Sequence, residues 1–212
     1  MMTLCAVLLS AGTLFCVPVS AEPIPPMDVK PELAELGKML FFDPILSGNY
    51  AMPCSACHLP EASWAVQDKI SFGYPGTRHW RNSQTIVNAA YDTELFWAGS
   101  SNLLEGQARS AARGGVAGNS EDDLMEAWLA FVPEYRERFR DVFGDDWPNI
   151  RHAYMAIAAF RRTIVQTDTP FDACMQGDRD ALNDQQKRRL ELFAGKAGRV
   201  ACHNDPLFSD QL

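Results

Sequence analysis

Apolar side chains recur at helical spacing along most of the chain. In residues 32–42, an apolar face is followed by Asp43-Pro44, which ends the pattern. Residues 149–165 form the longest periodic stretch. The positions predicted to face inward there are Tyr154, Ile157, Ala158, Phe160 and Ile164. Because no stretch alternates with the two-residue period of a strand, we expect an all-α protein.

Cap residues indicate where several of the helices begin. Ser120 is followed by three acidic residues, which suit the positive end of a helix, so we expect Ser120 to cap a helix that ends near Phe131 and restarts after Pro133. Asn183 is expected to cap a last helix that runs to about Ala194. Shorter periodic patterns predict two further helices, at residues 83–91 and 103–113.

Two segments interrupt the helical pattern. Residues 59–83 are rich in Gly, Pro and polar side chains and predict a long loop, which in a compact domain is usually functional. The run Thr167-Asp168-Thr169-Pro170 is the best candidate for a domain boundary. We therefore expect a first domain at residues 22–168 and the start of a second at 169–212. Because the sequence stops at Leu212, we expect the second domain to be incomplete.

The N-terminus has the composition of an export signal. Residues 2–21 are mostly apolar and end in the small-residue cleavage pattern Val19-Ser20-Ala21, but are too short and interrupted for a membrane span. No Lys or Arg precedes Lys30, so the usual positive segment is missing. We interpret residues 1–21 as a signal peptide cleaved after Ala21. The mature protein is then expected to be periplasmic, with no transmembrane span.

The net charge of the chain bears on which kinds of molecule the protein binds. The 212 residues carry a formal net charge of −8, which argues against a nucleic-acid partner. An acidic surface is compatible with docking a basic redox protein, although many proteins are this acidic.

The strongest chemical signal is Cys54-Ser55-Ala56-Cys57-His58. This Cys-x-x-Cys-His pattern is typical of c-type haem attachment. On one helical turn, the two thiols can each add to a vinyl group of one haem. The histidine that follows then gives its imidazole to the iron. Haem c is attached outside the bacterial cytoplasm, which agrees with the export signal.

Two other interpretations of the Cys-x-x-Cys pair were considered. A zinc site needs a second pair of ligands, for which the chain offers only the adjacent Cys202-His203. A thioredoxin-like redox pair would follow a strand, and no strand pattern precedes Cys54. The segment 199–203 repeats the haem pattern with Arg199 in place of the first cysteine. Cys202 would still allow one thioether bond, and His203 would still be able to bind iron.

Six segments together carry a family resemblance. They are residues 36–44, 54–58, 81–83, 96–99, 156–163 and 202–208. In this order they resemble the bacterial di-haem cytochrome c peroxidases and their relatives of the methylamine-utilisation type. The resemblance implies two cytochrome c-like domains, the second one truncated here, with a calcium ion near their interface. It also implies that the N-terminal haem reacts with peroxide and that the C-terminal haem receives electrons.

The resemblance assigns roles to individual residues. It implies that His58 is the iron ligand, Trp97 lies between the haems, Asn82 belongs to the calcium site, and Gln107 to the peroxide pocket. By residue type alone, Trp97 would be a core aromatic, Asn82 a helix cap and Gln107 a surface residue. His79, which would be solvent-exposed by default, lies in the loop where many relatives carry a switchable distal histidine. We retain all these as candidates.

One departure from the family pattern concerns the peroxide pocket. Relatives usually carry a glutamate about ten residues after the glutamine, and Ala117 stands there in this chain. We expect a peroxidase that reduces hydrogen peroxide with electrons from a small periplasmic cytochrome c or cupredoxin; a homodimer is allowed. The alternatives are a methylamine-utilisation type oxidase that acts on a partner protein, and a mono-haem electron carrier or inactive fragment.

Overall fold

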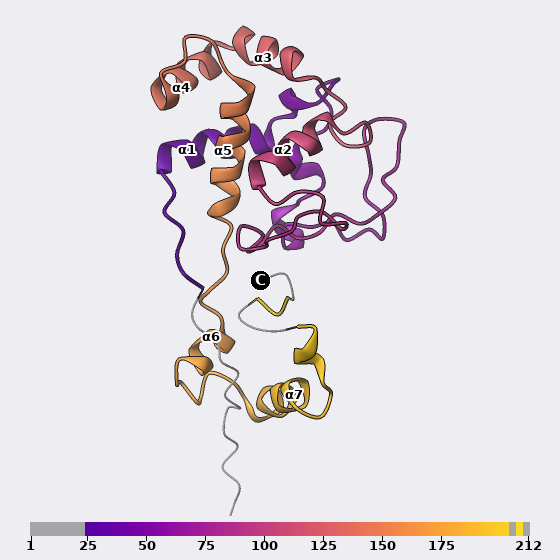
Figure 1. The fold of residues 1–212 in the computed structure, drawn as a ribbon, viewed down its shortest axis with the longest axis vertical. Coiled ribbons are helices and arrows are strands. Elements are labelled where there is room, and N and C mark those ends of the chain that lie inside the picture. Colours follow the sequence, from indigo (N-terminus) through magenta and orange to yellow (C-terminus); the bar gives the residue numbers. More distant parts are fainter. Residues whose placement is uncertain (1–23, 204–206, 210–212) are drawn as a thin grey trace, which may run out of the picture. The chain divides into compact units, whose positions relative to one another are not determined.

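The computed structural model describes residues 24–203 and 207–209. The chain divides into two compact units, one formed by Pro25–Gln166 and the other beginning at Thr167 (Figure 1). This division falls beside the interruption at residues 167–170. The expected signal peptide, residues 1–21, lies outside the described residues.

Helices make up the regular structure of both units. The first contains α1 (Pro31–Phe42), α2 (Leu104–Arg113), α3 (Asp122–Phe131), α4 (Pro133–Phe143) and α5 (Ile150–Arg162), with 3-10 turns at Pro44–Leu46, Cys54–Ala56 and Pro60–Ala62. The second contains α6 (Pro170–Met175), α7 (Asp184–Ala194) and a 3-10 turn at Arg199–Ala201.

The all-α expectation is confirmed for the described residues. They form no strand and only isolated β-bridges. None of their helices is both long and apolar enough to cross a membrane. The long segment between α1 and α2 contains the turns and loops that surround the candidate site.

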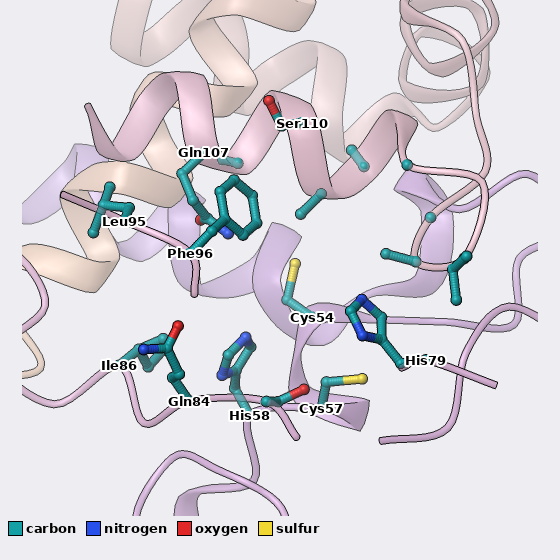
Figure 2. Close-up of a pocket in the computed structure, with 18 of the residues that line it drawn as sticks. Cys54, Cys57, His58, His79, Gln84, Ile86, Leu95, Phe96, Gln107 and Ser110 are labelled. Atoms are coloured by element: carbon teal, nitrogen blue, oxygen red, sulfur yellow. The ribbon is translucent and has the colours of Figure 1, made fainter. Parts of the chain in front are cut away.

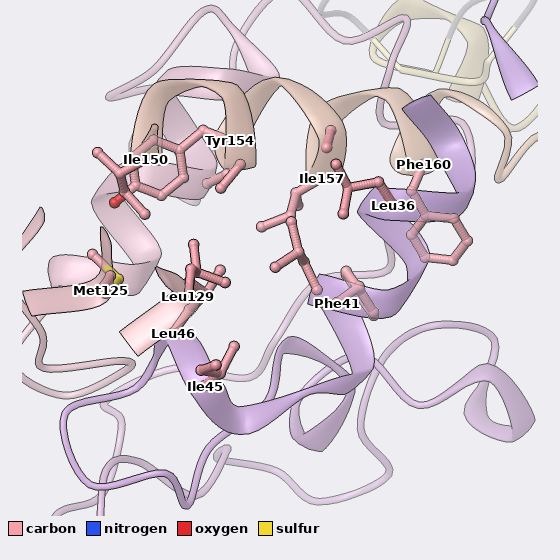
Figure 3. Packing of buried hydrophobic residues seen from close by; sticks show 14 of the residues in the cluster. Leu36, Phe41, Ile45, Leu46, Met125, Leu129, Ile150, Tyr154, Ile157 and Phe160 are labelled. Carbon is pink, nitrogen blue, oxygen red and sulfur yellow. The ribbon is translucent and has the colours of Figure 1, made fainter. Parts of the chain in front are cut away.

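The first unit is built on the crossing of α1 and α5, visible in Figure 1. The two backbones approach so closely that a Cβ atom on Gly37 would lie 1.8 Å from the carbonyl oxygen of Ala156. Only glycine fits at this point of α1, because any side chain would overlap the backbone of α5. Leu36 and Phe41 then pack beside Ile157 and Phe160 (Figure 3).

The remaining helices extend this core. From α3, Met125 and Leu129 are buried, and from α4, Tyr135 and Phe139. The hydroxyl of Tyr135 also donates a hydrogen bond to Asp43 at 2.9 Å, which ties α4 to the end of α1. Because α1 and α5 are anchored from several sides, they form a rigid wall for the loops between α1 and α2.

Several helix ends agree with their sequence signals. Asn149 accepts a hydrogen bond from the backbone N–H of Arg151 at 2.9 Å and caps α5. Asn183 and Gln186 form a reciprocal capping box at the start of α7, as expected from the cap residue. The patterns at 32–42, 103–113 and 149–165 each correspond to a helix.

The helix expected at residues 83–91 is not formed. The segment is extended and then turns at residues 87–90. Asn88 has a positive φ of 60°, and its side chain accepts from the backbone N–H of Gln166 and donates to the carbonyl of the same residue. These bonds tie the segment to the chain after α5. A partner distant in sequence thus replaces the local helical hydrogen bonds.

The cap expected at Ser120 is also wrong. Helix α3 begins at Asp122, and the side chain of Ser120 is buried without capping it. Asp122 instead receives hydrogen bonds from Arg109 of α2 at 2.6 Å and from the hydroxyl of Tyr154 of α5 at 2.8 Å. Tertiary contacts therefore fix the start of α3.

Candidate haem-binding site

A cavity of about 580 Å³ lies between α2, α5 and the loops that follow α1. This volume is in the usual range for cofactor sites. Figure 2 shows Cys54, Cys57 and His58 on one side and Gln107 of α2 across from them. The residues of the Cys-x-x-Cys-His motif and the candidate pocket residue therefore share one space.

The motif is folded as a tight turn. The backbone N–H groups of Cys57 and His58 both donate to the carbonyl of Cys54, at 3.2 and 3.1 Å. Both thiols are free and line the cavity. Burial raises the pKa of Cys54 to about 11, so this group is held as a neutral thiol. The turn thus presents two uncharged sulfurs to the same space.

His58 is oriented by a backbone carbonyl. Its Nδ1 lies 3.2 Å from the carbonyl oxygen of Trp64, and since that oxygen can only accept, Nδ1 carries the hydrogen. Burial lowers the pKa of His58 to about 4, which keeps the ring neutral at physiological pH. The lone pair of a neutral ring then resides on Nε2. This is the second-shell arrangement found for histidines that bind a metal.

The opposite wall is made by small side chains of α2. Ala108, Ala111 and Ala112 line the cavity beside Gln107. Ala117 also lines it, at the position where the resemblance expects a carboxylate. The nearby carboxylate of Glu105 does not replace it, because Glu105 is paired with Arg162 at 2.9 Å.

One functional residue, Arg161 of α5, was missed in the sequence. It lines the cavity, is only 5% exposed, and donates from Nη1 to the side-chain oxygen of Gln107. Burial lowers the pKa of Arg161 to about 10, so it stays charged at neutral pH. Its position provides a signal: Arg161 follows Ile157 by four residues and therefore belongs to the inward face of α5.

The other candidates in the first unit surround the cavity. His79 lines it, stacks on Trp80 with ring centroids 4.6 Å apart, and is neither fully exposed nor buried. Trp97 also lines it but is 56% exposed, so the expectation from residue type alone, that Trp97 is a core aromatic, is wrong. The indole N–H of Trp97 donates to the carbonyl of Asn82 at 2.8 Å. His79, Trp97 and Asn82 thus lie on one continuous rim.

Asn82 does not cap a helix. Its side-chain nitrogen donates to the carbonyls of Asp68 at 2.6 Å and Val66 at 3.4 Å, which holds the loop. Within the part of the chain that the structure describes, no cluster of three or more His, Cys, Asp or Glu side chains is arranged for a metal ion.

Cys202 and His203 belong to the second unit. The N–H groups of both residues donate to the carbonyl of Arg199, at 3.1 and 2.9 Å, which repeats the turn of the first motif. The Nδ1 atom of His203 lies 3.1 Å from the carbonyl oxygen of Phe208. Both Cys202 and His203 are exposed.

The first motif fits a haem c group. Two neutral thiols, a neutral imidazole whose lone pair lies on Nε2 and a wall of small side chains meet in one cavity of adequate volume. The guanidinium of Arg161 is buried, and its Nε–H has no partner among the described residues. Haem carries carboxylates, so a buried cation in this cavity is compatible with haem binding.

Comparison with known proteins agrees with this geometry. A profile of the family described as di-haem cytochrome c peroxidase matches residues 31–180. The chain is 54% identical over 197 residues to cytochrome-c peroxidase IdrP1 of Pseudomonas sp. (strain SCT), covering 89% of this chain and 52% of the relative. It is 38% identical over 181 residues to methylamine utilization protein MauG of Methylorubrum extorquens, covering 85% and 51%.

A solved structure supports the same relationship. The crystal structure of a MauG-like protein associated with microbial copper homeostasis has a TM-score of 0.79 at 27% identity, covering 89% of this chain and 59% of that one. The chain spans about half the length of the curated relatives it matches. The extent of the matched profile and the identity to these relatives show that the chain belongs to the di-haem cytochrome c peroxidase family.

Proposed function

We propose that the protein is a periplasmic oxidoreductase that reduces hydrogen peroxide to water with electrons from a small redox protein. The observation that carries the proposal is the meeting of Cys54, Cys57 and His58 with Gln107 in one cavity. Proteins named cytochrome-c peroxidase are similar to 89% of this chain, which matches about half of their length. Export by the signal at residues 1–21 would bring the protein to the compartment in which haem c is attached.

We assign a separate role to each of the main residues that line the cavity. Cys54 and Cys57 would hold the cofactor through thioether bonds, and the imidazole of His58 would bind its iron. When bound, the haem supplies a coordination position for peroxide and a route for electrons. Gln107 lies across the cavity and offers hydrogen bonds to the oxygen atoms there. His79 on the rim is a candidate to hold or move a proton near the peroxide.

The electron balance calls for a second redox centre. Reduction of one peroxide molecule consumes two electrons and two protons and yields two water molecules. We assign the second centre to the second unit, where Cys202 allows one thioether bond and His203 one iron bond. Trp97, exposed on the rim and fixed by Asn82, is proposed as the relay between the two centres.

We further propose that Asn82 contributes to a calcium site. Its amide nitrogen already donates to backbone carbonyls, so the amide oxygen is the atom that would bind a hard cation.

The electron donor is proposed to be a small cytochrome c or a cupredoxin, which is compatible with the net charge of −8. Residues 22–168 would form the peroxide-reacting domain, and 169–212 the start of the electron-accepting one. A homodimer is compatible with the proposal.

One observation favours a second candidate function. Ala117 lines the cavity where family peroxidases carry a carboxylate, which removes a positioned proton-transfer group. An oxidase of the methylamine-utilisation type, acting on a partner protein, is therefore the alternative. A mono-haem electron carrier is the remaining one.

The proposed function is tested on protein exported in a host with a c-haem assembly system. Mass spectrometry after denaturation should find haem on the peptide with Cys54 and Cys57. Reduced cytochrome c or cupredoxin should be oxidised when peroxide is added, at two equivalents per peroxide. Haem that extracts into acidic organic solvent would contradict the site. Covalent haem without peroxide-dependent oxidation of either donor would contradict the activity and favour the alternatives.

A further inference from the structure

Arg161 is a buried cation without a paired acid. Among the described residues, no carboxylate lies within ion-pair distance of its guanidinium, although its neighbour Arg162 pairs with Glu105. Burying a charge is costly unless polar partners compensate. Its side-chain hydrogen bond goes to Gln107, which lies on a different helix 54 residues earlier in the chain. The carboxylates of Glu105 and Asp92 act on its charge only from beyond ion-pair distance.

That hydrogen bond fixes the direction of the Gln107 amide. A guanidinium has donors only, so the atom of Gln107 that faces Arg161 is the oxygen. The amide nitrogen then lies on the other branch of the side chain, and its two hydrogens have no partner among the described residues.

The orientation matters because of where Gln107 lies. Figure 2 shows it on α2, facing the cavity across from His58. An oxygen atom bound on that side would meet a hydrogen-bond donor if the nitrogen is presented, and a second acceptor if the oxygen is presented. The difference decides whether the site attracts or repels a ligand that carries negative charge.

We propose that Arg161 is a positioning residue that holds Gln107 with its amide nitrogen directed into the cavity, as a hydrogen-bond donor to the ligand bound opposite His58. The inference rests on the proposed haem site. It assigns Arg161 no contact with peroxide, and its effect passes through Gln107. The neighbouring Arg162 provides a matched control, since it has the same charge on the same helix and is paired elsewhere.

The first test does not depend on haem. In a ¹⁵N-correlated NMR spectrum, the side-chain amide signals of Gln107 are identified by their absence in Gln107→Leu. Arg161→Met should shift these signals and increase their solvent exchange, and Arg162→Met should leave them in place. Unchanged Gln107 signals in a folded Arg161→Met variant would overturn the proposal.

The second test measures ligand affinity in the haem-loaded protein. Fluoride binds ferric iron and accepts hydrogen bonds, whereas carbon monoxide on ferrous iron is a poor acceptor. Gln107→Leu and Arg161→Met should each weaken fluoride binding about tenfold, the worth of one such hydrogen bond, and leave carbon monoxide binding unchanged. The double variant should bind fluoride no more weakly than Gln107→Leu, because the two residues act in series.

Three results of these binding measurements would contradict the proposal. Additive losses in the double variant would mean that the charge of Arg161 acts on the anion directly. Equal weakening of fluoride and carbon monoxide with a lowered melting temperature would mean a structural role only. If Arg161→Met does not fold, Arg161→Gln is used instead. Its amide can bind Gln107 in either orientation, so wild-type fluoride affinity in that variant would also refute positioning. Protein that shows the expected fluoride pattern but no peroxide turnover would contradict the proposed function alone.

Discussion

Two turns of the chain have the same backbone geometry. Cys54–Ala56 and Arg199–Ala201 are both 3-10 turns, and in each the next cysteine and histidine donate to the carbonyl of the first residue. In both, the histidine Nδ1 faces a backbone carbonyl a few residues later, at 3.2 Å for His58 and 3.1 Å for His203. The same local sequence pattern thus accompanies the same turn and the same contact of the imidazole with a backbone carbonyl.

The surroundings of the two turns differ. His58 faces a cavity lined by α2 and α5, and burial lowers its pKa. His203 is exposed within the described part of the chain, and Arg199 stands where the first turn has a thiol. The comparison teaches that the turn comes from local sequence, whereas the space for a cofactor comes from helices that are distant in sequence.

Removing both thiols of the first turn should have the largest effect. In Cys54→Ala/Cys57→Ala, no thioether can form there, so covalent haem on this peptide should be lost completely. Mass spectrometry of the denatured protein measures it. Cys202→Ala is the control and should leave the haem on the first peptide in place. Haem retained covalently in the double variant would show that another residue attaches it.

Replacing the histidines tests which turn supplies the ligand of the cavity. His58→Ala should leave both thioethers but remove the iron bond, so the haem stays attached and its Soret band moves. In a Cys202→Ala background, where no haem is attached at the second turn, His203→Ala should leave this band unchanged. An unchanged absorption spectrum in His58→Ala would assign the iron ligand to a different side chain.

The helix crossing behind the first turn can be tested separately. Gly37→Ala would place a Cβ atom 1.8 Å from the Ala156 carbonyl, which should destabilise the first unit by about 3 kcal/mol. Gly106→Ala in α2 makes only an ordinary contact and should stabilise slightly, because alanine favours helix. Denaturant unfolding measures both. Equal stability of the two variants would argue against the tight crossing.

Restoring the second motif should have the smallest effect. Arg199→Cys supplies the missing thiol on a turn that already has the required geometry, so a haem at this turn should gain a second thioether bond. Peptide mass spectrometry would detect the additional link. Arg199→Ser, which is close in size but cannot form the bond, is the matched control. The idea fails if the cysteine variant shows no additional thioether.

The sequence by itself determined the haem turn and most helices. Cys54, Cys57 and His58 lie within five positions, so their geometry depends on local backbone bonds alone. Asn183 caps its helix, as expected, for the same reason. The candidates His79, Trp97 and Gln107 came from the family resemblance, and the fold brings all three to the cavity.

Only the tertiary structure decided the features that depend on distant partners. Asn88 bonds to Gln166 and abolishes the helix expected at residues 83–91, a pairing that no local pattern contains. Arg161 belongs to an inward helix face, but its partner Gln107 is set by the packing of α2 on α5. Local hydrogen bonds and helical periodicity depend on residues that are close in sequence, so the sequence alone predicts them. These contacts join residues that are distant in sequence, and they form because buried polar groups in a compact chain need hydrogen-bond partners.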